Sequence, residues 1–490
     1  MINATVAWIA LPFFIGFVIY LFPKLDRPLA LAMALISAVY AGQLFLNEPL
    51  NIQLLDSFGV TLIIDQLSGF FILTNALVTT AVIVYCWQTD KKPYFYMQAI
   101  ILHGSVNAAF VCADFISLYV ALEVISVAAF SLITYPRTDK SIWVGLRYLF
   151  VSNTAMLFYL MGALLVYKAN NSFHYQGLLN APPEAVALIV LGLLVKGGIF
   201  VSGLWLPLTH SESQSPVSAM LSGVVVKAGV FPLVRCALLL EAFDPIVRIF
   251  GVGTALLGVF WAIFEKDTKR TLAFSTVSQL GFILAAPEVG GFYALTHGLV
   301  KSALFLISGI LPSRDFRQLQ QQPINTSVWI PLAIASFSIS GFPLLSGFGA
   351  KILTAKNLLP WQVIAINVAT VGTTIVFAKF IFLPHRPLPR KEKGEIQQQG
   401  GNAGKKIQPG FWWAMVILLG GLVVANIFYY EAYTLRNIIK PLLTIAIGWG
   451  AYLVILKKFV FKLPRGIEEL DHLIGVMSLM LIVVFWMVQV

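Results

Sequence analysis

Two long apolar segments lie within residues 191–235, and each carries one lysine near its middle, Lys196 in the first and Lys227 in the second. A cation at the centre of a bilayer costs about 2.5–3.5 kcal/mol on insertion scales, so such a lysine is rarely an accident of packing. The first segment is also interrupted by residues that weaken or end a helix, namely Gly197, Gly198, Gly203 and Pro207. Broken helices of this kind occur where backbone lines a buried, hydrated cavity, so the stretch predicts an ion or proton path.

The composition indicates that these segments belong to a membrane protein. Apolar residues make up 58% of the 490 residues and charged residues only 11%, whereas a soluble domain carries about 25% charge. We therefore predict an all-α polytopic membrane protein, and helices of about 20 residues leave room for roughly 14 to 16 spans. Sixteen apolar stretches fit this description: 3–22, 28–46, 66–87, 95–113, 115–134, 143–167, 183–208, 217–240, 245–264, 270–287, 290–311, 327–356, 361–384, 411–430, 436–456 and 470–489.

The chain divides into five predicted regions. Residues 1–113 supply N-terminal helices and a short β-hairpin near 50–64, where polar and apolar residues alternate about a Ser-Phe-Gly turn. The remaining regions are a first repeat over 95–240, a second over 245–384, a flexible Gly- and Gln-rich inner loop over 385–410, and C-terminal helices over 411–490.

The basic residues predict the orientation in the membrane. If the N-terminus lies on the outer side, most of the 33 lysines and arginines fall in inner loops, and the outer loops hold only Lys168, Arg248, Lys356, Arg436 and Lys440. This distribution follows the positive-inside rule. We expect a multi-pass protein of a bacterial-type plasma membrane, or of another energy-transducing membrane, with its N-terminus outside.

Unusual residues recur along the chain at a nearly constant spacing. Three pairs are separated by 152 to 156 positions: Lys196 with Lys351, Lys227 with Lys379, and Glu123 with Gln279. Five spans lie between the members of each pair, and an odd number of spans inverts the topology. The spacing therefore predicts two inverted repeats with broken helices in corresponding places, as in many transporters.

Glu123 is the acidic residue that stands out within the predicted spans. An unpaired carboxylate at that depth would be neutral, so we expect a cationic partner, and Lys196 has the matching depth. Opposite charges about 4 Å apart attract by ~4 kcal/mol at an effective dielectric constant near 20, so separating the pair would release a proton from the lysine. A purely structural ion pair is the alternative.

The other buried cations are interpreted from their depth in the membrane. Lys227 has small or apolar flanks and lies far from both helix ends, so we expect it to be the central proton carrier of the first half. Lys351 takes the matching part in the second half. Lys379 lies near an inner helix end and is expected to snorkel to the interface.

Histidines are candidates to link these lysines. His297 and Lys301 are four residues apart and share a helix face, and an imidazole with a pKa of about 6.5 suits a proton relay. A core histidine with satisfied hydrogen bonds is the alternative. His210, between the two lysine-bearing helices, is either a proton-uptake group or a loop residue, and His103 is expected to be structural.

The sequence predicts no cofactor and no metal site. The three cysteines, Cys86, Cys112 and Cys236, show neither paired nor metal-ligand spacing. No P-loop, dinucleotide-binding glycine motif or nucleophile elbow is visible.

Four stretches carry a resemblance to a known family: WLPLTHSESQSPVSAMLSGVVVKAGVFPLVR, KRTLAFSTVSQLGFIL, HGLVKSALFLISG and SGFPLLSGFGAKILTAK. They resemble the antiporter-like proton-pumping subunits shared by respiratory complex I and the Mrp-type multisubunit cation/proton antiporters. The stretch ADFISLYVALEV and the lysine at position 351 look most like the D-type member of the Mrp antiporters. The chain departs from the family at Leu208 and Thr209, where an Asp-Ala or similar pair is usual before the histidine.

The resemblance implies a fold of about 14 core transmembrane helices with two inverted five-helix repeats, to which this chain adds two C-terminal helices. It also implies an integral-membrane, proton-translocating subunit of a multisubunit Na⁺ or K⁺/proton antiporter, in which a Glu/Lys ion pair gates protons that move through buried lysines and a histidine. The residues that carry these implied roles are Glu123, Lys196, Lys227, His297, Lys301 and Lys351.

Other functions remain open at this point. An antiporter-like subunit of an NADH or ferredoxin:quinone oxidoreductase would use the same path, and a membrane module of an inorganic-carbon uptake complex is a further alternative. We expect a transporter subunit and not an enzyme, unless the chain belongs to such a redox-driven translocase. The expected partners are other membrane subunits, protons, a monovalent cation and the lipid bilayer, with no nucleic acid. The sequence does not say which cation is exchanged, with what stoichiometry, or whether both repeats conduct.

Overall fold

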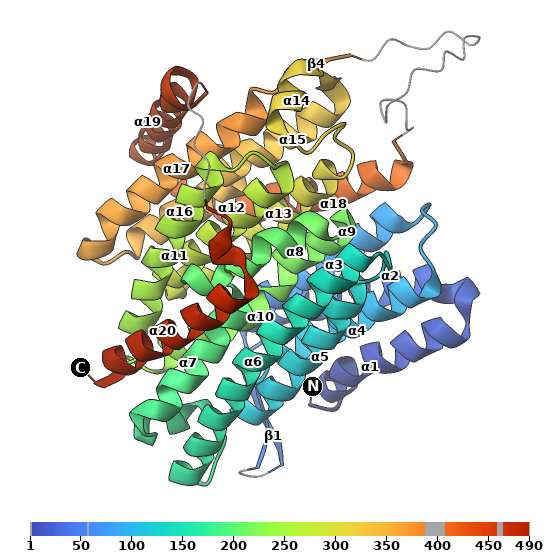
Figure 1. Cartoon of the computed structure of the whole chain (residues 1–490). Coiled ribbons are helices and arrows are strands. Elements are labelled where there is room, and N and C mark those ends of the chain that lie inside the picture. The colour runs from blue at the N-terminus through green and yellow to red at the C-terminus, as the bar shows by residue number, and fades with distance from the viewer. Residues whose placement is uncertain (1, 56–57, 388–406, 458–463, 490) are drawn as a thin grey trace.

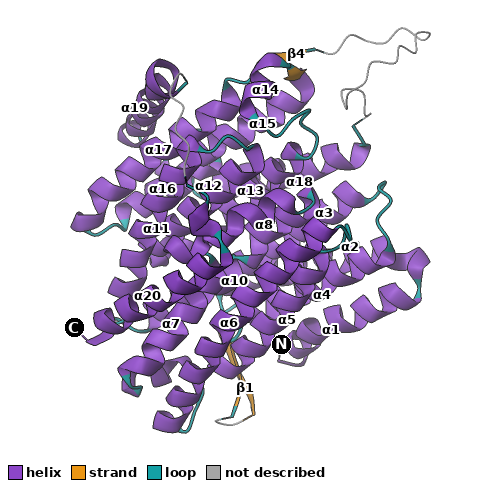
Figure 2. Cartoon of the chain, in the orientation of Figure 1, coloured by secondary structure: helices purple, strands orange, loops and turns teal. Residues whose placement is uncertain are grey.

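Figure 1 shows the computed structural model, which describes residues 2–55, 58–387, 407–457 and 464–489. Helices account for most of the described chain, and most of them run side by side with a common inclination (Figure 2). The N-terminal helix Ile2–Leu21 lies at one flank of the molecule, and the helices Val363–Ile381 and Leu435–Ala451 lie at the opposite flank.

The N-terminal part and the first half of the core contain ten α-helices and one hairpin among the described residues. In chain order these are α1 (Ile2–Leu21), α2 (Asp26–Leu44), β1 (Leu50–Leu55), β2 (Gly59–Ile64), α3 (Gln66–Cys86), α4 (Pro93–Ala109), α5 (Phe115–Ile133), α6 (Asp139–Asn170), α7 (Pro183–Gly197), α8 (Leu206–Glu212), α9 (Ser215–Met220) and α10 (Lys227–Leu239).

The second half and the C-terminal part are also mainly helical. In chain order they contain α11 (Asp244–Phe264), α12 (Thr268–Ala285), α13 (Gly290–Ser308), α14 (Phe316–Gln321), β3 (Ile324–Asn325), α15 (Thr326–Ser340), α16 (Ser346–Lys356), α17 (Val363–Ile381), β4 (His385–Arg386), α18 (Pro409–Ile427), α19 (Leu435–Ala451) and α20 (Leu470–Gln489).

The structure confirms the prediction of an all-α polytopic membrane protein. Among the residues that the structure describes, thirteen helical segments are long and apolar enough to cross a membrane. The other three predicted spans also coincide with helices: α4 is shorter, α12 is richer in polar residues, and α15 with α16 forms one broken span. The repeat boundaries at 95–240 and 245–384 stay a prediction, and most of the predicted flexible loop 385–410 lies outside the described residues.

The predicted hairpin is present and is anchored to the core. β1 and β2 pair antiparallel, with Leu50 opposite Ile64. The side chain of Asp114 accepts a hydrogen bond from the Thr61 N–H of β2 at 2.7 Å and another from the Ser117 N–H at 2.7 Å, so one carboxylate holds the hairpin and caps α5.

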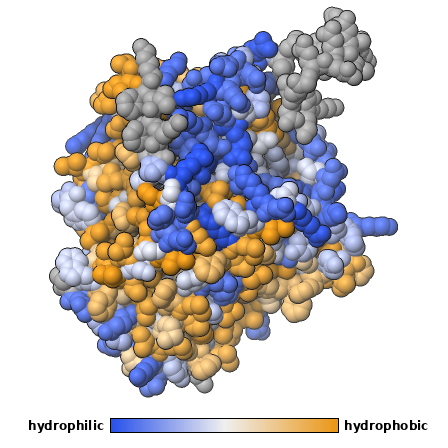
Figure 3. All heavy atoms as spheres, viewed as in Figure 1, coloured by the Kyte–Doolittle hydropathy of each residue, from blue (hydrophilic) through white to orange (hydrophobic). Residues whose placement is uncertain are grey.

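The two innermost helices are α12 and α13. Every residue of both helices is buried, including the serines and threonines of α12. A helix with polar residues all round is stable at this depth because protein, and not lipid, surrounds it. The outer surface is different: apolar side chains cover much of it in Figure 3, and hydrophilic ones gather toward the side of α14 and β4.

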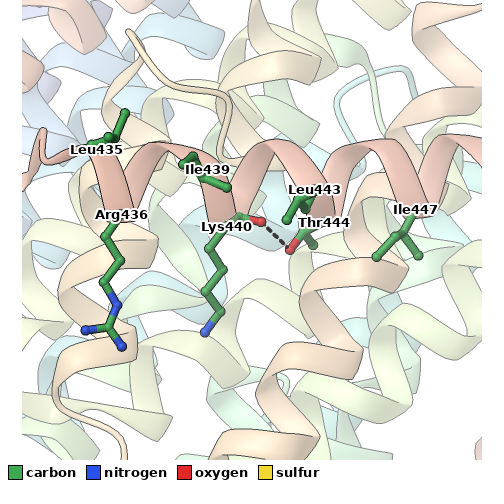
Figure 4. Close-up of a pocket in the computed structure, with 7 residues that line it drawn as sticks. All are labelled: Leu435, Arg436, Ile439, Lys440, Leu443, Thr444 and Ile447. Atoms are coloured by element: carbon green, nitrogen blue, oxygen red, sulfur yellow. Dashed lines mark hydrogen bonds between the residues drawn. The ribbon is translucent and has the colours of Figure 1, made fainter.

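The two additional C-terminal helices lie on different faces of the molecule. α19 packs beside α17, whereas α20 packs against α7 and α6 (Figure 1). The segment before α20 is tied to the core by Glu468, whose carboxylate accepts two hydrogen bonds from Arg270, at 2.5 and 3.1 Å. Figure 4 shows one exposed face of α19, which carries Leu435, Arg436, Ile439, Lys440, Leu443, Thr444 and Ile447.

Glycines set a close helix contact in the second half, between α11 and α12. A Cβ atom added at Gly281 would lie 2.4 Å from the Ala255 N and 2.4 Å from the Gly251 O. A Cβ atom at Gly258 would lie 2.3 Å from the Ser278 N. The backbones of the two helices therefore touch, which is how small residues pack helices within membranes.

Gly281→Ala should weaken this contact, because the new methyl group meets rigid backbone on α11. We expect a loss of about 1–3 kcal/mol of stability, the usual cost of overpacking, measured by thermal unfolding of the purified protein in detergent. The matched control is Gly420→Ala on α18, where nothing lies within 4 Å of the added Cβ atom. Equal stability of the two variants would contradict the close contact.

Candidate functional site

Two spans are broken within their length, as the sequence predicts. α7 ends at Gly197, and Gly198 follows with φ +67°, its N–H bonded to the carbonyls of the last helical turn. α15 ends at Ser340, and Gly341 follows in the same way with φ +84°. Glycine adopts this left-handed conformation without the cost that a Cβ atom brings.

The predicted lysines lie on opposite sides of the two breaks. Lys196 precedes Gly198 by two residues, whereas Lys351 follows Gly341 by ten and belongs to α16. The spacing of about 155 residues between the lysines therefore does not superpose one break on the other. Both lysines lie near a break in a span, but they do not occupy equivalent positions relative to that break.

Lys196 does not form the predicted ion pair with Glu123. Its Nζ donates to the Leu122 carbonyl at 3.0 Å, to the Ser152 hydroxyl at 2.9 Å and to the Ser126 hydroxyl. The Glu123 Oε1 is buried and has no hydrogen-bond partner among the residues that the structure describes. The pair is therefore open in this structure.

Helix geometry explains this correction. Leu122 and Ser126 are four residues apart and so lie on one face of α5, the face that the Lys196 side chain reaches. Glu123 is one residue further along and lies about 100° around the helix, because an α-helix has 3.6 residues per turn. The two serines were missed in the sequence, although a hydroxyl inside an apolar span is a signal that could have pointed to them.

Lys227 is fully buried behind an irregular turn of its own helix. Residues Leu221–Val225 form a π-helical turn, and the Lys227 Nζ donates to the Ser222 carbonyl at 3.0 Å. Such turns shift the register of backbone carbonyls and are frequent at functional sites. Within the described chain Lys227 has no ion-pair partner, as the sequence predicts from its flanks.

Two glycine contacts place Lys227 beside the other candidates. A Cβ atom at Gly229 would lie 2.3 Å from the Gly197 N, so the helices that carry Lys227 and Lys196 touch next to both lysines. A Cβ atom at Gly298 would lie 3.7 Å from the Lys227 Cε, so α13 approaches Lys227 at the residue that follows His297.

His297 and Lys301 both lie on α13 and are buried. The Lys301 Nζ donates to the Leu272 carbonyl of α12 at 2.9 Å and lies 5.3 Å from the centre of the Phe377 ring. Both ring nitrogens of His297 are buried without a hydrogen-bond partner in the described part of the chain. The alternative of a core histidine with satisfied hydrogen bonds therefore does not fit.

Lys351 and His297 meet at one small cavity. The Lys351 Nζ is buried, has no partner among the described groups, and lies 5.7 Å from the centre of the Phe282 ring. The cavity measures about 10 Å³, about what the centre of one water molecule needs. Its lining consists of Gln279, Tyr293, Thr296, His297, Val300, Ile339, Gly347, Ala350 and Lys351.

His210 is not a loop residue. It lies in α8, is 0% exposed, and stacks on the Phe305 ring of α13 at 4.8 Å between centroids. Both of its ring nitrogens lack hydrogen-bond partners in the described structure. Of the two alternatives, proton uptake is the one that stays a prediction. His103, by contrast, bonds Ser37 at 2.8 Å and Thr79 at 3.2 Å, as expected of a structural residue.

Lys379 does not snorkel. Its side chain is 9% exposed, and its Nζ donates to the carbonyls of Ala262, Ile263 and Glu265 at 2.9, 3.1 and 2.7 Å. These carbonyls are at the C-terminal end of α11, where they have no partner within the helix and where a cation is favourable. The lysine is therefore a helix cap.

Lys379→Met should lower the stability of the protein by about 1–3 kcal/mol, because buried carbonyls would lose their donor. Thermal unfolding in detergent measures this loss. Lys356→Met, at an exposed position at the end of α16, is the matched control. If both variants unfold at the temperature of the unchanged protein, the capping role is wrong.

The site and the fold together define a class: a polytopic membrane protein with two broken spans and a series of buried, unpaired cations. The chain belongs to the NADH:quinone oxidoreductase/Mrp antiporter transmembrane family, whose pattern matches residues 112–377. The match contains every candidate residue of the site.

Individual relatives extend the similarity over nearly the whole chain. The D-type subunit of the Na⁺/H⁺ antiporter of Alkalihalophilus pseudofirmus is 25% identical over 486 residues, covering 90% of this chain and 98% of that protein. A chain of the Mrp complex from Dietzia sp. DQ12-45-1b has the same fold, with a TM-score of 0.71, 19% identity, and coverage of 96% and 98%. A chain of the membrane-bound sulfane sulfur reductase, an archaeal respiratory membrane complex, has a TM-score of 0.74, 20% identity, and coverage of 92% and 99%.

Proposed function

We propose that this chain is a proton-translocating membrane subunit of a multisubunit Na⁺ or K⁺/proton antiporter. The observation that carries the proposal is the series of buried lysines without carboxylate partners, Lys196, Lys227, Lys301 and Lys351. Keeping an ammonium group in such surroundings costs free energy, so four of them in one protein favour a role in moving charge.

The relatives support the D-type role within such a complex. The D-type subunit of the A. pseudofirmus Na⁺/H⁺ antiporter aligns over almost the full length of both chains. We therefore propose that the chain works with other membrane subunits in a bacterial-type plasma membrane, with its N-terminus outside, as the basic loops indicate.

We propose a path that enters from the inner side at His210. From there the proton reaches Lys301, Lys227 and His297, and it leaves through the cavity that His297 shares with Lys351. The unpaired nitrogens of both histidines support this order, because each can accept a proton and pass it on. The cavity supports it because it joins His297 to Lys351 and has room for about one water molecule.

Glu123 and Lys196 form the proposed gate. In this structure Lys196 is bonded to neutral acceptors, and Glu123 lies one residue from one of them. We propose that Lys196 leaves the two serines to pair with Glu123 in another state of the cycle. The charge beside Gly197 would then change. Because the helix of Lys227 touches Gly197 at Gly229, this change would alter the electrostatic potential at Lys227.

A second candidate is an antiporter-like subunit of a redox-driven respiratory complex. The observation that favours it is the similar fold of a chain in an archaeal respiratory membrane complex. The same line of lysines would serve both, so the driving force must be tested directly.

Lys227→Ala should reduce proton movement to the background of vesicles without the complex, because the central carrier is removed. Proton flux in vesicles, normalised to the amount of assembled complex, measures this. Lys356→Ala, which removes an exposed lysine of the same chain, should leave the flux unchanged. Undiminished flux in a correctly assembled Lys227→Ala complex would show that Lys227 is not the carrier.

Adding Na⁺ or K⁺ to everted vesicles that carry the native complex, with no electron donor present, should produce a pH change. The same change should be absent from Glu123→Ala vesicles, because the gate lacks its carboxylate. If no change occurs until a reduced donor is supplied, the chain belongs to the redox-driven complex instead.

A further inference from the structure

The break between α15 and α16 contains a strained residue that is not glycine. Leu344 has φ +80°, in the left-handed region that side chains other than those of glycine rarely adopt. Its own side chain is 74% exposed and does not hold it in place. Strained backbone of this kind persists only where its surroundings impose it, and it gathers at functional sites.

Two side chains from the C-terminal part hold Leu344. Its N–H donates to the Tyr433 hydroxyl at 3.1 Å, and its carbonyl accepts from the Asn426 Nδ2 at 3.3 Å. Tyr433 in turn donates to the Asn426 Oδ1 at 2.8 Å. The three residues form a closed ring of hydrogen bonds, which we call the Leu344 clamp.

The position of Leu344 explains why a clamp is needed. α15 ends at Ser340 and α16 begins at Ser346, so the residues between them have no helical hydrogen-bonding pattern of their own. Leu344 is exposed on the surface of the described structure, and its partners lie at the end of α18 and in the connection that follows it. A strained backbone outside a helix persists because side chains of the protein hold its polar groups.

The clamp is continuous with the packing of α16. The rings of Phe348 and Tyr433 are 4.8 Å apart, and Phe348, Ile352 and Ala432 form a small buried cluster. Lys351 lies between Phe348 and Ile352 in the sequence of this helix. A movement of the clamp therefore moves the helix that carries the lysine.

The first break has a similar contact. Phe200 also has a left-handed backbone, with φ +55°, and its N–H donates to the hydroxyl of Thr254 at 2.9 Å. In both halves a hydroxyl from another helix or loop thus binds the N–H of the strained residue that follows the break. The contact at Leu344 comes from the segment between α18 and α19, at the start of the additional C-terminal helices.

We infer that Tyr433 and Asn426 are positioning residues for Lys351: by fixing Leu344 they hold α16 at the depth that keeps the Lys351 ammonium group at the cavity beside His297. This inference rests on the proposed role of Lys351 in proton transfer. It gives the C-terminal segment a part in the second half of the path.

The test uses Tyr433→Phe and Asn426→Leu in the complete complex, with Tyr430→Phe as the matched control. Tyr430 lies in the same connection, and its side chain is 70% exposed. Each clamp variant removes two of the three hydrogen bonds, so both should lower the maximal cation-dependent proton flux by about tenfold. The cation concentration at half-maximal flux should not change, because the clamp acts on a proton carrier.

Leu344→Gly supplies a rescue, since glycine adopts φ +80° without strain. Added to Tyr433→Phe, it should recover part of the lost flux, at least about twofold. Flux that stays normal in assembled Tyr433→Phe and Asn426→Leu complexes would overturn the inference, and so would an equal loss in Tyr430→Phe.

Hydrogen exchange separates this inference from the proposed function. In the purified complex, the amides of residues 342–349 should exchange about tenfold faster in Tyr433→Phe than in Tyr430→Phe, whether or not protons are transported. Unchanged exchange overturns the clamp. If exchange is faster in Tyr433→Phe but proton flux is normal in Lys351→Ala, the clamp stands and the proposed role of Lys351 is overturned. If Tyr433→Phe does not assemble, Asn426→Leu gives the same comparison, because it removes two of the three hydrogen bonds.

Discussion

Inside a bilayer every backbone polar group and every charge must find its partner within the protein, because hydrocarbon offers none. The buried lysines of this chain meet that constraint in a common way: Lys196, Lys227, Lys301 and Lys379 each donate to backbone carbonyls. A carbonyl is a neutral acceptor, so it satisfies the hydrogen bonds of an ammonium group without cancelling its charge. Lys351 differs, because its Nζ faces a cavity and has no partner among the described groups.

The same constraint explains the arrangement of helices around the site. α12 and α13 carry many polar side chains, and every residue of both helices is buried by the helices around them. Glycines allow the enclosing helices to approach, as at Gly229 beside Gly197 and at Gly281 beside α11. Close packing then leaves little free space, so a cavity with room for one water molecule is a distinctive feature of the region between His297 and Lys351.

At each of the two broken spans, backbone groups beside the break form hydrogen bonds with side chains, but these side chains come from different parts of the protein. At the first break, Thr254 holds Phe200 from within the core. At the second, the break reaches the outer surface, and residues at the end of α18 and after it supply the hydrogen bonds. The C-terminal helices also contact both halves, since α19 packs on α17 and α20 packs on α7. The additional helices therefore contact the helices around the proposed path, although none of the candidate proton carriers lies on them.

The sequence by itself determined the class of the protein, its spans, the hairpin, the glycine breaks and the lysines near them, because hydropathy, charge and glycine position act locally along the chain. Only the tertiary structure decided which groups meet. Lys196 bonds Ser126 and Ser152 and not Glu123, since one residue of displacement turns a side chain about 100° around its helix. Lys379 caps α11 because the C-terminal end of that helix lies beside it. His210 is buried because α13 places Phe305 against its ring. The contact of Tyr433 with Leu344 joins positions 89 residues apart, and no local pattern encodes a distance between helices that only packing sets.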